Sequence, residues 1–192
     1  MFDMGVYCIN AARYLFRSEP ISIFATSANN GEERFREAEE MMAVIMRFSD
    51  ERLATFTCSF GAADVSRYTL VGSKGLLTCD PAYEYAMEIK HTLSVNDKTK
   101  EKIFPKRGQF AAELLYFSDC ILKDRQPEPS GLEGLADVRI VQAIYQSAKS
   151  GKEVELPELP RKKRPTPAQE IHRPGHAKPG TVKAKSPSGQ AA

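Results

Sequence analysis

Several features that would place this chain in a familiar class are missing from its sequence. It has no apolar run of about 18 residues and no signal peptide with a charged start and an apolar centre, so no membrane-spanning helix is predicted. It has no CxxC pair and no histidine at ligand spacing, which argues against a zinc site or a redox motif. The cysteines stand far apart, at Cys8, Cys58, Cys79 and Cys120. We expect reduced thiols, no metal and a cytoplasmic protein without a membrane partner.

Charge is divided unevenly along the 192 residues. Residues 157–192 hold 8 Lys or Arg and 2 Asp or Glu, which leaves 19 basic and 23 acidic residues for residues 1–156. The tail is rich in proline and glycine and has almost no large apolar side chains, so it cannot bury enough surface to offset its ordering entropy. We predict one folded domain at residues 1–156 and a basic tail, extended or disordered, at residues 157–192.

The tail contains a dense basic cluster at residues 161–164. Such a cluster is a candidate nucleic-acid or localisation patch. No aromatic residues are interleaved with it, and the folded part of the chain is acidic. We therefore expect no nucleic-acid partner, and we favour a solvated tail that lies along a neighbouring subunit.

The first part of the domain reads as a helix followed by antiparallel strands. Apolar spacing predicts a helix over residues 1–17, which Pro20 stops. Alternation then predicts a strand over residues 21–26, and residues 41–48 and 53–60 form a hairpin. The clean alternation of the return strand is typical of an antiparallel sheet with one face in the core.

A second hairpin joins residues 68–71 to residues 76–79 through a turn that contains Gly72 and Gly75. These glycines permit the positive φ that a tight turn needs. Alternation continues beyond this hairpin and predicts further strands around Tyr83, Tyr85, Met87, Ile89, Leu93 and Val95.

Two helices and an edge strand complete the domain. Phe110, Leu114, Phe117 and Ile121 form a helical stripe. The next helix is announced by a capping box, in which Ser130 is followed by Glu133, and Gly151 is a suitable cap at its end. Its expected buried face is Leu135, Val138, Val141, Tyr145 and Ala148. With a short edge strand at residues 152–156, the fold class is α+β: an open, mostly antiparallel sheet of about five or six strands with helices on one face.

The stretch that most resembles part of an active site lies at residues 1–17. Asp3 stands four residues before Tyr7, with Gly5 between them, so in a helix both side chains project from one face of the first turn. A carboxylate beside a phenol is suited to proton transfer with a substrate hydroxyl. The alternatives are a tyrosine packed on the sheet and a carboxylate favoured by the helix dipole. Asn10, one turn beyond Tyr7, is a candidate to bind a substrate hydroxyl.

Three motifs resemble the C-terminal half of the Gfo/Idh/MocA oxidoreductases, especially the branch of glucose-fructose oxidoreductases and sugar dehydrogenases. They are D-M-G-V-Y at 3–7, Y-T-L-V-G-S-K-G at 68–75 with D-P-A-Y at 80–83, and E-P-S-G-L-E-G-L-A-D-V-R at 128–139. The first motif is weak alone, but the three in this order make a specific resemblance over residues 1–156.

The resemblance implies a role for each matching residue. In this family an N-terminal Rossmann domain and an open antiparallel sheet bind NAD or NADP in the crevice between them. The tyrosine of the D-x-G-x-Y helix acts there as an acid/base group beside the substrate hydroxyl, and this implies that role for Tyr7, with Asp3 near the same site. Gly5 would allow close approach of the backbone to the substrate. The other catalytic residue of the family is a lysine in an E-K-P motif of the nucleotide domain.

The sequence departs from the family in one respect. It has no E-K-P motif and no G-x-G-x-x-G after a strand, and residues 131–136 (GLEGLA) are only a helix start. We expect no cofactor-binding residue in this chain, which we interpret as a fragment or a truncated gene model without the Rossmann domain.

Two functions remain open. The first is the substrate-binding and oligomerisation part of an NAD(P)-dependent oxidoreductase that acts on a sugar or polyol CH–OH group, inactive by itself and assembled as a homodimer or homotetramer through the open sheet face. The alternative is a non-enzymatic module that only oligomerises or binds a partner.

Overall fold

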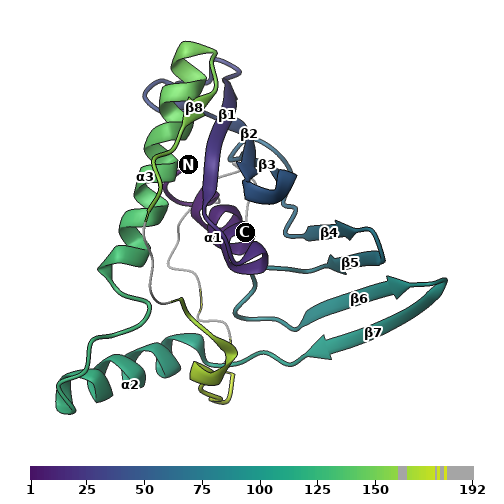
Figure 1. Cartoon of the computed structure of the whole chain (residues 1–192), viewed down its shortest axis with the longest axis vertical. Coiled ribbons are helices and arrows are strands. Elements are labelled where there is room, and N and C mark those ends of the chain that lie inside the picture. Colours follow the sequence, from purple (N-terminus) through teal and green to yellow (C-terminus); the bar gives the residue numbers. More distant parts are fainter. Residues whose placement is uncertain (160–163, 176, 178–179, 181–192) are drawn as a thin grey trace. The chain divides into compact units, whose positions relative to one another are not determined.

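The structure is a computed structural model that describes residues 1–159, 164–175, 177 and 180. The predicted α+β class is confirmed, since helices accompany open antiparallel sheets. Within these described residues the strands form two four-stranded sheets, in place of the single sheet of about five or six strands that the sequence predicts. Figure 1 follows the elements along the chain.

The described residues divide into two compact units. The first contains those of Met1–Ala62 and Glu128–Arg164, and the second contains those of Ala63–Pro127 and Pro165–Ala184. The candidate site residues of the sequence all belong to the first unit.

The first unit is built on an antiparallel sheet with the strand order β3-β2-β1-β8. Its elements are α1 (Gly5–Phe16), β1 (Pro20–Ala28), the 3₁₀ turn η1 (Glu33–Phe35), β2 (Met41–Phe48), the 3₁₀ turn η2 (Ser49–Glu51), β3 (Leu53–Ser59), α3 (Gly131–Ser150) and β8 (Val154–Glu155). Ala25 pairs with Val44, and Val44 pairs with Phe56, so these three side chains share one face of the sheet. The predicted first helix, first hairpin and edge strand are confirmed.

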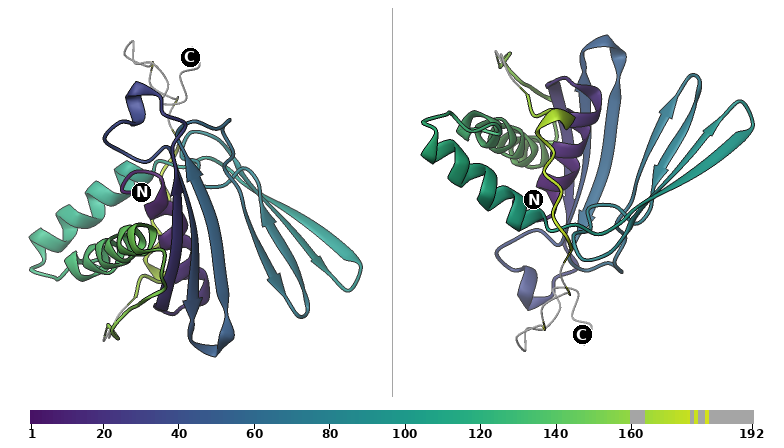
Figure 2. Two further views of the ribbon diagram at one scale, coloured as in Figure 1. Left: turned by 90° about the horizontal axis from the view of Figure 1, so that it is seen from above. Right: turned by 90° about the horizontal axis from the view of Figure 1, so that it is seen from below.

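Helices α1 and α3 lie on the same face of this sheet (Figure 2). Ile9 of α1 and Ile144 of α3 are fully buried in one core with Ile23 and Met46 of the strands. The Phe16 ring meets the Phe48 ring edge-on, with 4.9 Å between the ring centroids. This packing fixes which side of α1 faces the protein and which faces solvent.

The buried face of α3 is rotated from the predicted one. Of the predicted large side chains, Leu135, Val138 and Tyr145 are exposed. The buried side chains are those of Ala136, Ile140, Val141, Ala143, Ile144 and Ser147. Ser147 takes a place in the core because its hydroxyl accepts a hydrogen bond from the Ala25 N–H at 2.9 Å and donates one to the Lys152 carbonyl at 2.6 Å. Small residues let α3 approach the sheet closely. The predicted buried face is wrong because it was chosen mainly from the large apolar side chains.

The ends of α3 agree with the sequence in part. Ser130 is the N-cap as predicted, but its hydroxyl accepts from the Leu132 N–H at 3.3 Å rather than from the residue three positions on. Glu133, the other member of the predicted capping box, directs a carboxylate oxygen to Arg13. Gly151 caps the C-terminus in the left-handed conformation, at φ 65°, as predicted.

The second unit holds a separate antiparallel sheet with the strand order β4-β5-β6-β7. Its elements are β4 (Tyr68–Gly72), β5 (Gly75–Cys79), β6 (Ile89–Val95), β7 (Lys98–Phe104), α2 (Gln109–Leu122) and the 3₁₀ turn η3 (Pro167–Gln169). The hairpin of β4 and β5 is confirmed, but neither Gly72 nor Gly75 has a positive φ. A Cβ on Gly75 would lie 2.4 Å from the Ser94 carbonyl oxygen, so this glycine serves the close approach of β6.

Strand β7 is absent from the sequence prediction because four of its seven residues are charged: Lys98, Lys100, Glu101 and Lys102. Asn96 and Asp97 connect it to β6 with φ values of 49° and 59°, the pattern of a two-residue hairpin turn. The predicted alternation at Tyr83, Tyr85 and Met87 is wrong, since the strand begins only at Ile89.

Helix α2 is confirmed, but its apolar stripe is not buried. Phe110, Leu114, Phe117 and Ile121 are 52–68% exposed. Within the described part of the tail, Pro174 bridges to Arg107. The basic residues 161–163 lie outside the described residues, as does most of the segment for which an extended or disordered tail is predicted.

Candidate functional site

The exposed side of α1 carries two of the candidate site residues predicted from the sequence, Tyr7 and Asn10. Tyr7, Asn10 and Tyr14 follow one another at spacings of three and four, and all three are exposed. The Tyr7 side chain, 55% exposed, lies on the first turn of the helix. Tyr14 continues the row and lies under the Arg17 guanidinium, which is 5.7 Å from the ring centroid. Tyr7 and Asn10 are therefore neighbours on one surface.

Asp3 lies outside the helix. Helix α1 begins at Gly5 and has no acidic residue in its first turn, so the expectation that Asp3 projects from that turn is not met. Asp3 is an exposed residue of the preceding turn, which the Gly5 N–H closes by donating to the Met1 carbonyl at 3.0 Å. Its role beside Tyr7 stays a prediction.

Gly5 has a packing role in this structure. A Cβ added to it would lie 2.1 Å from Cε of Met1, whose side chain is buried in the core. The lack of a side chain at Gly5 therefore permits Met1 to pack against the start of α1. A contact of Gly5 with substrate stays a prediction.

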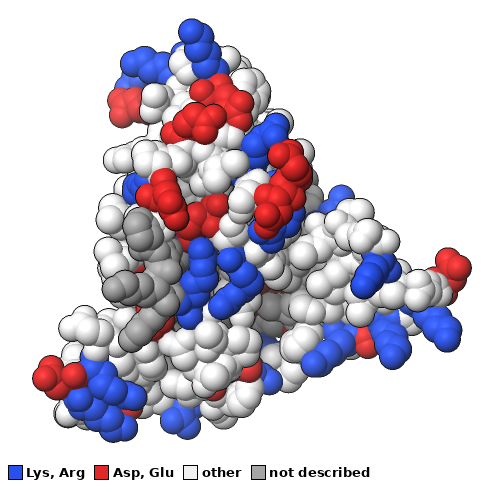
Figure 3. All heavy atoms as spheres, viewed as in Figure 1, with Lys and Arg blue, Asp and Glu red and all other residues white. Residues whose placement is uncertain are grey.

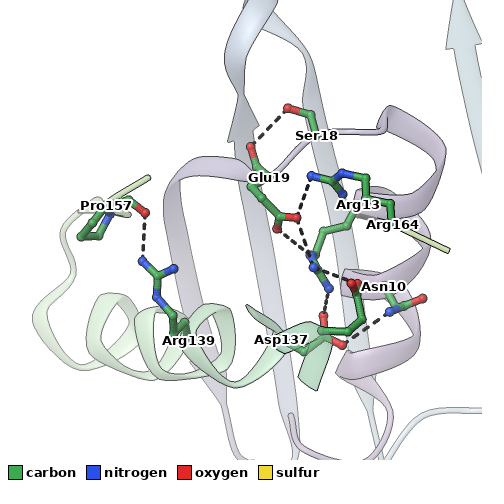
Figure 4. Close-up of polar contacts among 9 residues, drawn as sticks. Asn10, Arg13, Ser18, Glu19, Asp137, Arg139, Pro157 and Arg164 are labelled. Carbon is green, nitrogen blue, oxygen red and sulfur yellow. Dashed lines mark hydrogen bonds and ion pairs between the residues drawn. The ribbon is translucent and has the colours of Figure 1, made fainter. Parts of the chain in front are cut away.

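The side of α1 that faces the core holds a buried arginine. The Arg13 guanidinium is only 1% exposed and meets three carboxylates. Its Nε donates to Glu19 Oε2 at 2.7 Å, its NH2 lies 2.9 Å from Glu133 Oε1, and its NH1 donates to Asp137 Oδ1 at 2.5 Å. Buried charges are tolerated when they are paired and hydrogen-bonded in this way. We call Arg13, Glu19, Glu133 and Asp137 the Arg13 cluster, of which Figure 4 labels Arg13, Glu19 and Asp137.

Burial and charge act in opposite directions on the groups of this cluster. For Arg13, burial lowers the pKa, but the hydrogen bonds and charges of Glu19 and Asp137 outweigh it and raise the pKa above its ordinary value. For Asp137, burial raises the pKa, and the Arg13 charge opposes this only in part. Arg13 is thus a permanent cation, and Asp137 is the carboxylate whose ionisation its surroundings disfavour.

A residue of the C-terminal tail reaches the same cluster. Arg164 NH2 lies 2.8 Å from Glu19 Oε1, which also accepts from Arg13 NH2 at 3.1 Å (Figure 4). The preceding chain is held to the first unit as well, because Leu156 N–H donates to the Ile21 carbonyl at 2.8 Å and Arg139 NH2 donates to the Pro157 carbonyl at 2.9 Å. The tail therefore contributes a second guanidinium, so two cations face three carboxylates.

Asp137 connects the buried cluster with the exposed row. Its Oδ1 accepts from Arg13, and its Oδ2 accepts from Nδ2 of Asn10 at 3.4 Å. Asn10 is predicted from the sequence as a site residue, but the Arg13 cluster next to it is not. One signal was present: Arg13 follows Ile9 by one turn on the apolar side of the helix, where a charge demands partners.

Other polar features lie away from this row. Glu39 accepts from the Met1 amino group at 2.6 Å and from the Tyr145 hydroxyl at 2.7 Å; burial raises its pKa, but these hydrogen bonds lower it overall. A surface hollow of about 340 Å³ is lined by Ser27, Ala28, Asn29, Phe35, Arg36, Glu37, Ala38 and Glu39. It includes neither Tyr7 nor Asn10, both of which are exposed.

The described residues contain no group of three or more His, Cys, Asp or Glu side chains arranged to hold a metal ion. In the same part of the chain, no helix is long and apolar enough to cross a membrane. Acidic and basic side chains are interleaved over the face that Figure 3 shows, unlike the continuous basic surface typical of nucleic-acid binding. What remains as a candidate site is the exposed row of α1.

This fold, with its helix-borne tyrosine at the start of the chain, corresponds to a known class of domain. Residues 1–156 match the family model described as the C-terminal alpha/beta domain of an oxidoreductase family. The chain belongs to the Gfo/Idh/MocA oxidoreductase family, as the resemblance of its motifs implies.

Relatives with assigned activities include two dehydrogenases. The chain is 27% identical over 160 residues to D-xylose 1-dehydrogenase [NADP(+)] of Haloarcula marismortui and 24% identical over 160 residues to D-xylose 1-dehydrogenase (NADP(+)) 2 of Haloferax volcanii. Both matches cover 81% of this chain, but they cover only 43% and 47% of the relatives. The chain thus spans less than half the length of these relatives.

A solved structure shows the same fold. The aldose-aldose oxidoreductase from Caulobacter crescentus, complexed with glycerol, is 32% identical with a TM-score of 0.73. The similarity covers 80% of this chain and 46% of that chain.

Proposed function

We propose that this chain is the substrate-binding and oligomerisation part of an NAD(P)-dependent oxidoreductase that acts on a CH–OH group of a sugar or related polyol. The observation that carries the proposal is the exposed Tyr7 on the first turn of α1, beside Asn10, in a chain of this family. The relatives named as D-xylose dehydrogenases and aldose-aldose oxidoreductase support the sugar class.

The described residues of this chain do not offer the βαβ unit that commonly binds a dinucleotide. Every strand pair in the described residues is antiparallel, so this part of the chain has no βαβ unit with a glycine-rich turn at the start of its helix. We place the dinucleotide and the lysine that assists Tyr7 on a nucleotide domain that corresponds to the rest of the relatives' length.

Within this chain, Tyr7 exchanges the proton of the reacting hydroxyl. A phenol on a helix can give or take a proton when its oxygen is within hydrogen-bond reach of the substrate oxygen. Asn10 binds a second hydroxyl one turn further along α1, and the exposed Asp3 lies just before the same helix. NAD or NADP held by the nucleotide domain would exchange a hydride with the carbon that bears this hydroxyl, while Tyr7 exchanges the hydroxyl proton.

The test compares the chain with a full-length protein that joins it to its nucleotide domain. We expect the full-length protein to reduce NADP⁺ or NAD⁺ with an aldose, assayed on D-xylose and other aldoses by nicotinamide absorbance. The 192-residue chain alone is expected to show no turnover and no NADPH binding in a fluorescence titration. Micromolar binding by the chain alone, or a full-length protein inactive on every aldose, would refute the proposal.

The outer face of the first sheet supports the proposal that the protein is a homodimer or homotetramer. Ile21, Phe24, Ile45 and Leu53 are 41–55% exposed on the face away from the helices. Apolar patches of this kind commonly mark protein interfaces. We expect Phe24→Glu to lower the mass measured by light scattering, while the exposed control Thr26→Glu at the edge of the patch lowers it less. A wild-type monomer would contradict this.

Free cysteines support a cytoplasmic location.

A further inference from the structure

Asp137 uses its two carboxylate oxygens for different purposes. It lies on α3, one turn after Glu133, and approaches α1 from 127 residues away in the sequence. Oδ1 accepts from Arg13 NH1 at 2.5 Å, on the buried side of α1. Oδ2 accepts from Asn10 Nδ2 at 3.4 Å, on the exposed side. One carboxylate therefore joins the anchor of the helix to the proposed substrate surface.

The anchor holds this carboxylate in place. Arg13 is buried and is itself fixed by Glu19, whose two oxygens lie 2.7 Å and 3.1 Å from Nε and NH2 of the guanidinium. Glu133 binds the same guanidinium at 2.9 Å. A planar guanidinium with several partners has little freedom to rotate, so its hydrogen bond defines the position of Asp137.

The contact with Asp137 also determines which way the Asn10 amide points. An ionised carboxylate has acceptors and no donor, so the amide must turn its NH₂ group towards it. The amide carbonyl oxygen and the second N–H are then left for the solvent side, one turn from Tyr7. A carbonyl oxygen displayed there accepts a hydrogen bond from a hydroxyl group.

We propose that Asp137 is a positioning residue for the substrate subsite: held by Arg13, it orients the Asn10 amide so that the amide oxygen accepts a hydrogen bond from one sugar hydroxyl. The inference rests on the proposed function, because it takes a sugar as the ligand. It adds a residue from a distant helix that makes no contact with the sugar and acts only through Asn10.

The first test is a double-mutant cycle in the full-length protein. Asn10→Ala and Asp137→Asn are each expected to raise KM for the aldose about 3- to 10-fold, the range for loss of one neutral hydrogen bond, with kcat within about 2-fold. Asp137→Asn should add no further rise in KM when Asn10 is already alanine, since its effect passes through that side chain. Additive effects on KM would overturn the inference.

The second test separates positioning from folding. Ile144→Val changes the buried core of the same helix outside the Arg13 cluster and is the control: it should lower the free energy of unfolding while leaving KM within about 2-fold. The monodeoxy aldose that lacks the recognised hydroxyl should bind wild type about 3- to 10-fold more weakly and should be insensitive to Asp137→Asn. An Asp137→Asn penalty that is equal for the aldose and for every deoxy analogue would overturn the inference.

The outcomes also separate this inference from the proposed function. A full-length protein that is inactive on every aldose defeats both. If the protein is active and Tyr7→Phe removes most of its turnover, the proposed function holds, and an additive cycle then defeats the Asp137 inference alone.

Discussion

The two sides of α1 differ in what they contribute. On the buried side, Ile9 lies in the core and Arg13 joins three carboxylates, so this side is held by packing and by short ionic contacts. On the exposed side, Tyr7 and Asn10 are solvent-exposed, and Asn10 donates a hydrogen bond to Asp137. The core side thus anchors α1 to the domain, and the exposed side is held in place by that anchor. Changes to one side should affect stability, and changes to the other should affect turnover.

Loss of the anchor should have the largest effect on stability. Arg13→Ala leaves Glu19, Glu133 and Asp137 facing one another without the buried cation. Removing one partner of a buried pair costs about 3–5 kcal/mol, and we expect about 3 kcal/mol because these carboxylates keep 12–18% exposure. Urea unfolding of the chain, followed by circular dichroism, measures it.

Arg36→Ala is the matched control for this experiment. Arg36 also pairs with a carboxylate, Glu33 at 3.0 Å, but its side chain is 68% exposed. Surface pairs contribute about 0–1 kcal/mol, so this variant should lose little stability. Equal losses in the two variants would show that burial of Arg13 does not make the cluster an anchor.

The tail arginine should have a smaller effect. Arg164 reaches Glu19 at 2.8 Å and retains 21% exposure, so its contribution is discounted for solvent screening. We expect Arg164→Ala to lower the free energy of unfolding by about 0.5–1 kcal/mol. A double-mutant cycle with Glu19→Gln should return a coupling free energy of similar size. Strict additivity would mean that the tail does not bind the cluster.

The smallest effect is a dependence on pH. Burial holds the pKa of Asp137 in the folded protein above its ordinary value of 3.8, and the Arg13 charge offsets this only in part. Between the unfolded and the folded pKa the folded state binds more protons, so this group makes the protein less stable as pH rises through that window. Compared with Asp137→Asn, wild type should gain stability as pH falls from neutral towards 4. If wild type instead lost stability relative to Asp137→Asn as pH falls, the Arg13 charge would outweigh burial in setting the pKa of Asp137.

The sequence was sufficient where local patterns determine structure. Strands β1 to β3 and the helices follow from periodicity, and the Ser130 and Gly151 caps follow from residue type. The exposed row of α1 was also found, because Tyr7 and Asn10 are separated by one turn. The sequence pattern placed Asp3 in the helix because it does not show at which residue the helix begins. In the structure α1 begins at Gly5, so Asp3 lies in the turn before it.

The Arg13 cluster was not predicted from the sequence because its two halves, Arg13 with Glu19 and Glu133 with Asp137, are distant in the sequence. Arg13 and Asp137 are 124 residues apart, and no local pattern pairs them. Strand β7 was not predicted from the sequence for a different reason: its charged residues lack the apolar alternation of a half-buried strand. Pairing with β6 determines its structure instead.

The most direct test of the account is the turnover of Tyr7→Phe in the full-length protein, measured together with its stability. The change removes one oxygen from a side chain that is 55% exposed, so we predict that kcat falls by about 10²-fold or more while the free energy of unfolding changes by less than about 0.5 kcal/mol. Near-normal turnover would contradict the assignment of Tyr7 to proton transfer, and a large loss of stability would contradict the division of α1 into an anchoring side and a reacting side.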